Sequence, residues 1–233
     1  VQSSHVIVGQ PRMLDFEYMR WIAAVLDSHI QTHLNPDKLR LTHLGGGACS
    51  LARYCADVYP NSRNTVVELD AKLAEYVREW FDIPKSPRVK IRVGDAGTVT
   101  RSFAPASRDV VIRDVFAVDK TPAELTSVDF VREVDHSMAP GGLYILNCGD
   151  GPSLDGARAE VAALFEVFEQ VCLVADAAML KGRRRGNIII AASHSPLPAA
   201  GSAEAAAISR TLMGGGVPAQ YRDSAQTRQF ARL

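Results

Sequence analysis

The sequence has no excess of charge, few cysteines and no long apolar run. Its 233 residues carry 26 basic and 26 acidic side chains, so no bulk positive field would hold nucleic acid non-specifically. The longest apolar runs, residues 21–26 and 188–192, are far shorter than the roughly 20 residues of a membrane-spanning helix. No stretch matches G-x-x-x-x-G-K-[ST], which disfavours a phosphate-cradling nucleotidase. We therefore expect no nucleic-acid partner and no membrane span.

The four cysteines, Cys49, Cys55, Cys148 and Cys172, are too few for a disulfide framework in a chain of this length and never form C-x-x-C. Reduced, buried cysteines in a cytoplasmic protein are the favoured interpretation, with bridges or metal ligands as the alternative. No third metal ligand accompanies the histidine pair at 29 and 33, so no metal site is predicted.

Short apolar runs alternate with helical stretches along most of the chain. This alternation predicts βαβ units and a parallel sheet. The helices are expected at about 13–28, 48–58, 71–82, 122–138, 153–168 and 203–213. The strands are expected at 39–44, 65–69, 89–93, 109–112, 143–147, 171–174 and 188–192. We read the last two strands as an antiparallel pair at the sheet edge, joined by a basic turn at 183–185.

The predicted organisation has three parts. Residues 1–36 form an N-terminal helical segment, residues 37–194 the main α/β domain, and residues 195–233 a linker, a short helix and a C-terminal tail. The last dozen residues are polar and are expected to pack loosely. The basic turn is interpreted as a solvated edge, with anion binding as the alternative.

A glycine turn follows the first predicted strand and precedes a helix. Gly45, Gly46 and Gly47 let the backbone turn sharply and approach a ligand closely, and the helix that follows directs its N–H groups toward that place. The alternative is a turn needed only for packing.

Acidic residues follow the next three strands. Glu68 and Asp70 end the second strand, Asp95 and Ala96 follow the third, and Asp114 ends the fourth. A carboxylate after the second strand can bind ribose hydroxyls, and one after the third can accept from an adenine amino group. Because open α/β sheets bind ligands at the carboxyl ends of their strands, this series predicts an adenosine-containing ligand.

The same series, with Ala139-Pro140-Gly141-Gly142 before a fifth strand, resembles the class I S-adenosylmethionine-dependent methyltransferase fold. We therefore expect an α/β, Rossmann-like, seven-stranded, mostly parallel sheet with an antiparallel C-terminal edge pair. Within that superfamily, residues 2 to about 193 look most like the spermidine synthase (polyamine aminopropyltransferase) branch.

The resemblance implies a role for each matched residue. The glycine turn lies against the nucleoside, Glu68 binds ribose, and Asp95 binds adenine. Asp114 accepts the proton of the attacking amine. Tyr18 lines the pocket, and Gln2 matches an early ligand-binding glutamine. The co-substrate is then S-adenosylmethionine or its decarboxylated form, with no metal, and a homodimer is one assembly that the family allows.

The departures from the family pattern fall in the amine half of the site. Ala48 and Ala117 stand where the family has aspartates, and Met19 replaces a His or Gln after the pocket tyrosine. Each lost carboxylate removes a charge-assisted contact of about 1.5–3 kcal/mol to an ammonium group. Phe116 makes this half apolar, and Asp119 is close enough in sequence to substitute.

The resulting prediction is a spermidine synthase-like transferase. It would move an aminopropyl or other alkyl group from a sulfonium nucleoside to a small-molecule amine other than putrescine. Two alternatives stay open: a methyltransferase acting on an undetermined small molecule, and a non-catalytic relative that only binds the nucleoside.

Overall fold

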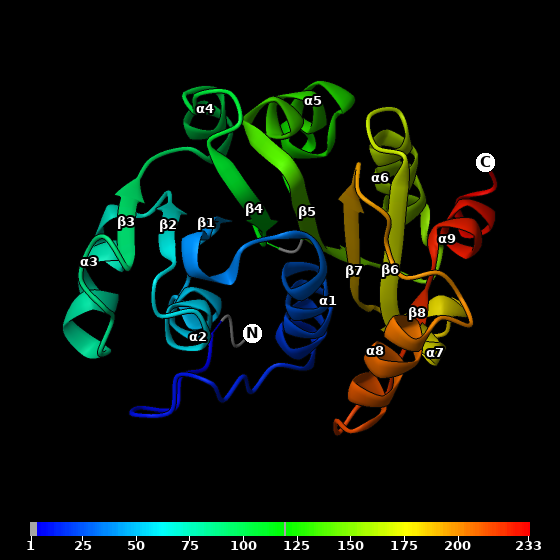
Figure 1. Ribbon diagram of the computed structural model, residues 1–233, viewed down its shortest axis with the longest axis horizontal. Coiled ribbons are helices and arrows are strands. Elements are labelled where there is room, and N and C mark those ends of the chain that lie inside the picture. Colours follow the sequence, from blue (N-terminus) through cyan, green and yellow to red (C-terminus); the bar gives the residue numbers. More distant parts are fainter. Residues whose placement is uncertain (1–3, 119) are drawn as a thin grey trace.

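The computed structural model describes residues 4–118 and 120–233, which fold around one twisted sheet (Figure 1). Within those residues the sheet has eight strands in the order β3-β2-β1-β4-β5-β7-β6-β8. The strands β1 to β5 run parallel, β7 is antiparallel to both β5 and β6, and β8 is antiparallel to β6. Their bounds are β1 Arg40–Leu44, β2 Arg63–Glu68, β3 Val89–Val93, β4 Arg108–Arg113, β5 Met138–Asp150, β6 Gln170–Asp176, β7 Gly186–Ser193 and β8 Ala219–Arg222.

Helices cover both faces of the sheet (Figure 1). Their bounds are α1 Glu17–His33, α2 Ser50–Val58, α3 Ala71–Trp80, α4 Ala96–Arg101, α5 Val128–Ser137, α6 Asp155–Phe165, α7 Ala177–Leu180, α8 Ala203–Met213 and α9 Ser224–Ala231, with short 3-10 turns at Pro36–Lys38 and Ala123–Thr126. One core cluster joins the sheet to α1, α2 and α8. A second joins it to α4, α5, α6 and α9, and a third, smaller cluster packs β2 and β3 against α2 and α3.

Side-chain alternation in β4 shows how one strand serves both layers. Val110 and Ile112 pack in the cluster below α1, while Val111 packs in the cluster on the opposite face. Because successive side chains of a strand point to opposite faces, the next residue on the α1 face is Asp114. The alternation thus places the Asp114 carboxylate at the end of a buried strand, on the face of the sheet that α1 covers.

The predicted fold class is confirmed, with one strand more than expected. The apolar runs at 171–174 and 188–192 do form antiparallel strands, β6 and β7. However, β8 pairs with the outer side of β6 and is the sheet edge. The expected loose packing of the last residues is wrong. Residues 219–222 form β8, and a capping box between Asp223 and Gln226 starts α9, whose Phe230 enters the core.

Two further features bear on the composition. Cys49, Cys55, Cys148 and Cys172 are free and buried, as the sequence analysis expected. Among the helices of the described residues, none has both the length and the apolar character needed to cross a membrane.

Candidate active site

The glycine turn lies between β1 and α2, and its geometry requires glycine. Gly45 has a backbone φ of +88° and Gly47 a φ of +47°. Residues other than glycine rarely adopt this region of backbone conformation. A Cβ on Gly45 would lie 2.2 Å from the backbone oxygen of Asp114, which rules out any side chain. The turn is therefore packed directly against the end of β4, and this contact joins two of the residues predicted from the sequence.

The Glu68 carboxylate lies against this turn. Its Oε2 accepts hydrogen bonds from the backbone N–H of Gly46 at 3.0 Å and of Gly47 at 3.1 Å, and its Oε1 accepts from the N–H of Asp70 at 2.9 Å. The structure thus brings together the end of β2 and the end of β1. About one acceptor position of the carboxylate stays free beyond those three bonds, because an ionised carboxylate has about four such positions.

The other two predicted carboxylates cap helices. Asp70 accepts from the backbone N–H of Lys72 and Leu73 at the start of α3. Asp95 accepts from the N–H of Thr98 at 2.8 Å at the start of α4, and these hydrogen bonds lower the pKa of Asp95. Ala96, the first residue of α4, is buried. Helix capping accounts for both carboxylates in this structure, and their predicted nucleoside contacts stay predictions.

Asp114 is the centre of a hydrogen-bonded group on the α1 face of the sheet. The Tyr18 hydroxyl donates to its Oδ2 at 2.9 Å, and the Asn147 side-chain amide donates to its Oδ1 at 2.9 Å. Burial raises the pKa of Asp114, and the two hydrogen bonds oppose that rise. Burial and the neighbouring Asp114 carboxylate raise the pKa of Tyr18.

Asn147 was not among the predicted site residues. The sequence places it near the end of the fifth predicted strand, next to the presumed pocket, and this was the only available signal. Its register partner in the sheet is Ile189 of β7, and β4 lies on the other side of β5. The pairing of Arg113 with Leu146 sets Asp114 beside Asn147, a relation that needs the strand order to be known.

A small cavity is lined by both the glycine turn and Asp114. Its volume is about 20 Å³, enough for about one water molecule. Its wall includes Gly45, Gly46 and Asp114, and it is completed by Met19, His43, Cys49, Leu51, Ala52, Val66 and Ile112. The two halves of the predicted site therefore share one space.

The chain that follows Asp114 is apolar and open. Val115 is half-buried, Phe116 is 37% exposed, and Ala117 forms an isolated bridge with Lys120.

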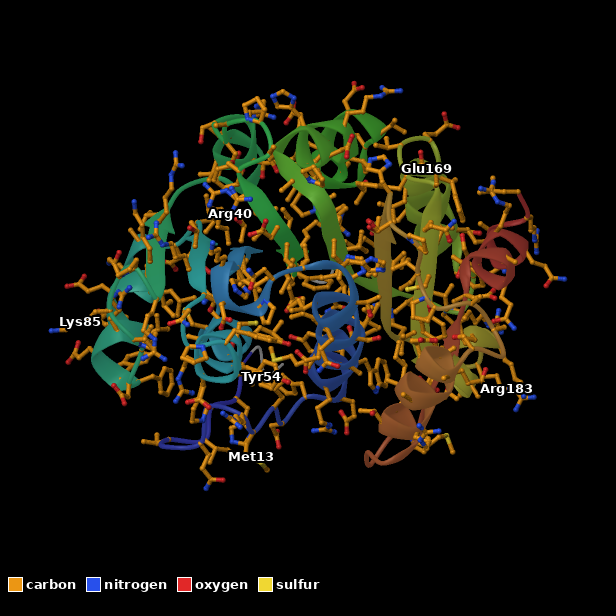
Figure 2. All side chains as sticks on the ribbon, viewed as in Figure 1. Met13, Arg40, Tyr54, Lys85, Glu169 and Arg183 are labelled. Carbon is orange, nitrogen blue, oxygen red and sulfur yellow. The ribbon has the colours of Figure 1, made fainter. Side chains whose placement is uncertain are left out.

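The remaining predicted residues lie away from this segment or cannot be placed. Two of them, Gln2 and Asp119, lie outside the residues that the structure describes. In the basic turn at 183–185, Arg184 forms an ion pair with Asp176 of β6 at 2.6 Å. Figure 2 shows Arg183 at the periphery of the molecule.

Comparisons with known proteins show the family to which this chain belongs. No protein-family model matches the chain. A solved structure of a probable spermidine synthase from Corynebacterium glutamicum is 59% identical, covers 98% of this chain and 82% of its own, and has a TM-score of 0.96. Human methyltransferase-like protein 13 in complex with SAH is 25% identical, with 86% of this chain and 94% of that chain covered and a TM-score of 0.66.

A third relative is a mouse eEF1A lysine and N-terminal methyltransferase, 31% identical over 144 residues, which are 57% of this chain. The match covers only 20% of that longer protein. The fold of this chain is that of the class I methyltransferase-like transferases. Within that class, the chain belongs to the spermidine synthase family, as the resemblance predicted.

Proposed function

We propose that this protein transfers an aminopropyl or other alkyl group from a sulfonium nucleoside, such as decarboxylated S-adenosylmethionine, to an amine acceptor. One observation carries the proposal: Asp114 and the glycine turn line the same small cavity. A group that can take a proton is thus next to the place where the fold binds nucleosides. The spermidine synthase relative supports the same reaction class.

In this proposal each element has a separate task. The glycine turn and Glu68 hold the ribose end of the nucleoside, and Asp95 holds the adenine. The sulfonium is an activated leaving group, so the protein has to align the acceptor and remove one proton. Asp114 takes that proton, and Tyr18 keeps its carboxylate oriented through the 2.9 Å hydrogen bond.

The acceptor in this proposal is an amine other than putrescine. Ala48 and Ala117 supply no carboxylate, and Phe116 presents an apolar surface beside Asp114. A second ammonium group on the acceptor would be desolvated without a partner, which is unfavourable by several kcal/mol. The four free, buried cysteines support our proposal of a cytoplasmic setting.

A methyltransferase is the second candidate, and two relatives favour it. The mouse and human proteins described above are both methyltransferases by name. The reaction would use the same nucleoside contacts with S-adenosylmethionine as the donor, and an apolar acceptor would suit Phe116.

A ligand-binding panel followed by a turnover assay tests the proposal. Thermal unfolding is followed with methylthioadenosine, S-adenosylhomocysteine and the two sulfonium donors; a ligand at 100 times its Kd stabilises the protein by about 2.7 kcal/mol. We expect decarboxylated S-adenosylmethionine and methylthioadenosine to raise the melting temperature of the protein most. In the turnover assay with a panel of amines, we expect alkyl transfer, with little product from putrescine. Stabilisation by S-adenosylhomocysteine with methyl transfer would favour the second candidate. Binding without turnover of either donor would indicate a non-catalytic relative.

A further inference from the structure

The side-chain oxygen of Asn147 is buried and has no hydrogen-bond partner among the described residues. The residue is only 2% exposed. Leaving a buried acceptor unpaired costs about 1–3 kcal/mol, and most such groups in folded proteins are satisfied. An unpaired amide oxygen on the residue that binds Asp114 therefore needs an explanation.

The hydrogen bonds around Asp114 fix the orientation of this amide. An ionised carboxylate only accepts hydrogen bonds, so the group that Asn147 turns toward Asp114 is its NH₂, with Nδ2 at 2.9 Å from Oδ1. The Tyr18 hydroxyl also donates to this carboxylate. Asn147 Oδ1 is therefore the end of the amide that is left to accept a hydrogen bond from a further donor.

We propose that Asn147 Oδ1 accepts a hydrogen bond from the nitrogen of the acceptor amine while the Asp114 carboxylate accepts a second one. This inference rests on the proposed function. A neutral primary amine has two N–H groups and one lone pair. Two adjacent acceptors on one side of the nitrogen hold both N–H groups and leave the lone pair directed away from them, toward the donor.

The reaction then balances without any further reactant. The amine lone pair forms the new C–N bond, the C–S bond breaks, and its electron pair returns the sulfonium to a neutral thioether. The nitrogen becomes positively charged as the bond forms, and one of its protons passes to the Asp114 carboxylate. Asn147 keeps its hydrogen bond throughout, so its effect is on binding and orientation of the amine.

This pair of acceptors also defines the substrate class. Two polar contacts meet at one nitrogen, whereas Val115, Phe116 and Ala117 continue the surface with apolar side chains. The arrangement fits a primary monoamine with an apolar body. We accordingly take n-butylamine as the probe and compare it with putrescine.

The experiment measures amine binding to protein already saturated with methylthioadenosine, by calorimetry on three variants and the unaltered protein. Asn147→Leu keeps the size but removes both polar ends of the amide. Asn147→Asp keeps an oxygen acceptor and removes the donor to Asp114. Asn187→Leu is the matched control, because Asn187 is a half-buried amide on the adjacent strand β7, paired with Gly149.

We expect Asn147→Leu to weaken n-butylamine binding about tenfold or more, with methylthioadenosine affinity changed less than about twofold, while Asn147→Asp and Asn187→Leu keep the amine. If Asn147 only braced Asp114, Asn147→Asp would be at least as damaging as Asn147→Leu, because it sets two carboxylates together. Three results would overturn the inference. They are a loss of amine affinity in Asn147→Asp at least as large as in Asn147→Leu, an unchanged amine affinity in Asn147→Leu, and no binding of n-butylamine to the unaltered protein saturated with methylthioadenosine. Failure of methylthioadenosine to bind would instead refute the proposed function.

Discussion

Asp114 is the residue at which the backbone and the proposed chemistry meet. Its N–H donates to the carbonyl of Leu44 at 2.8 Å, and its own carbonyl lies where a side chain on Gly45 would have to be. Neither contact involves the carboxylate. A change of the side chain alone should therefore leave the glycine turn in place, which makes the residue suitable for a test of chemistry.

We predict that Asp114→Asn lowers the rate of alkyl transfer about 100- to 10,000-fold, the usual range for a general base. Nucleoside affinity should stay almost unchanged. Because burial raises the pKa of Asp114, the rate of the unaltered protein should fall with decreasing pH at a higher pH than an ordinary aspartate would require. The single-turnover pH profile of the variant should lack that acid limb. A destabilised variant with an undiminished rate would exclude the role of base.

Glu68 combines a structural and a proposed binding task. We predict that Glu68→Ala weakens nucleoside binding by about 1.5–3 kcal/mol, the usual value for a hydrogen bond to a charged group. It should also lower the melting temperature, because Gly46 and Gly47 lose the acceptor of their N–H groups.

A second variant separates the two effects of Glu68→Ala in calorimetry. The Ser127 hydroxyl caps α5 by accepting a hydrogen bond from the N–H of Phe130. Ser127→Ala removes this cap and should destabilise the protein by about 0.5–2 kcal/mol. It should leave the nucleoside affinity unchanged. Equal losses of affinity in both variants would mean that Glu68 acts only through stability.

At the scale of elements, a buried ion pair joins β4 to α6. Arg113 is fully buried and Glu160 is 6% exposed; the two form a salt bridge, and Arg113 also donates to the carbonyl of Leu125. This carbonyl lies in the 3-10 turn that ends the chain segment after Asp114. The pair thus anchors both ends of the segment that carries Phe116.

We predict that Glu160→Ala lowers the free energy of unfolding by about 3–5 kcal/mol, because it leaves the Arg113 charge buried and unpaired. The double variant Arg113→Met with Glu160→Leu should recover much of that loss, since it removes both charges. Urea unfolding of the two variants is the measurement. A double variant as unstable as the single one would show that packing, and not the uncompensated charge, dominates.

The sequence predicted elements with a clear apolar pattern, such as β3 at 89–93, and missed the shortest ones, for physical reasons. The bounds of the longest strand were wrong, because β5 was expected at 143–147 and spans Met138–Asp150. The helix expected at 203–213 is α8, Ala203–Met213, because Ser202 caps one end and glycines follow the other. The helix α4 has six residues and β8 has four, too few for a clear hydrophobic period. The D-x-x-Q capping box at Asp223 could have indicated α9.

Most of the candidate site was predictable because each residue lies at the end of a strand. Gly45 and Asp114 follow β1 and β4, and Glu68 is the last residue of β2; parallel strands bring such positions together at their carboxyl ends. Contacts between distant segments were not predictable. Ser4 accepts from the N–H of Ala48 at 3.1 Å, so the N-terminal segment lies against the glycine turn, and no local pattern indicates this.

For the whole molecule, the proposed site and a group of charged residues around His194 lie at opposite ends of the strands. The site is at the carboxyl ends of β1 and β4. At the other end, His194 follows β7 and bonds with its two ring nitrogens to Glu169, which precedes β6, and to Asp135 of α5, at 2.5 and 2.8 Å. This histidine connects two strands to a helix, and its protonation can change stability without touching the site.

We predict that the protein loses stability as the pH rises above neutrality and that His194 contributes to this loss. Partial burial opposes the positive charge of His194, but the hydrogen bonds to Glu169 and Asp135 outweigh it and raise the pKa. A raised folded-state pKa means that the folded protein binds the proton more tightly than the unfolded chain does. The contribution is therefore complete below about pH 6.5, the ordinary pKa of histidine, and is lost as the pH rises through the higher folded-state value.

The measurement is the melting temperature between pH 5.5 and 8.5, from about one unit below to about two units above the ordinary histidine pKa. The melting temperature should fall more steeply with pH for the unaltered protein than for His194→Gln, because glutamine can bond to the two carboxylates only as a neutral amide. The control is His33→Gln, because His33 bonds to a backbone carbonyl, that of Pro196, and not to a carboxylate. Methylthioadenosine affinity at each pH should be the same in the His194 variant and the unaltered protein. Parallel pH curves for these two proteins would show that solvent screens the His194 contacts completely.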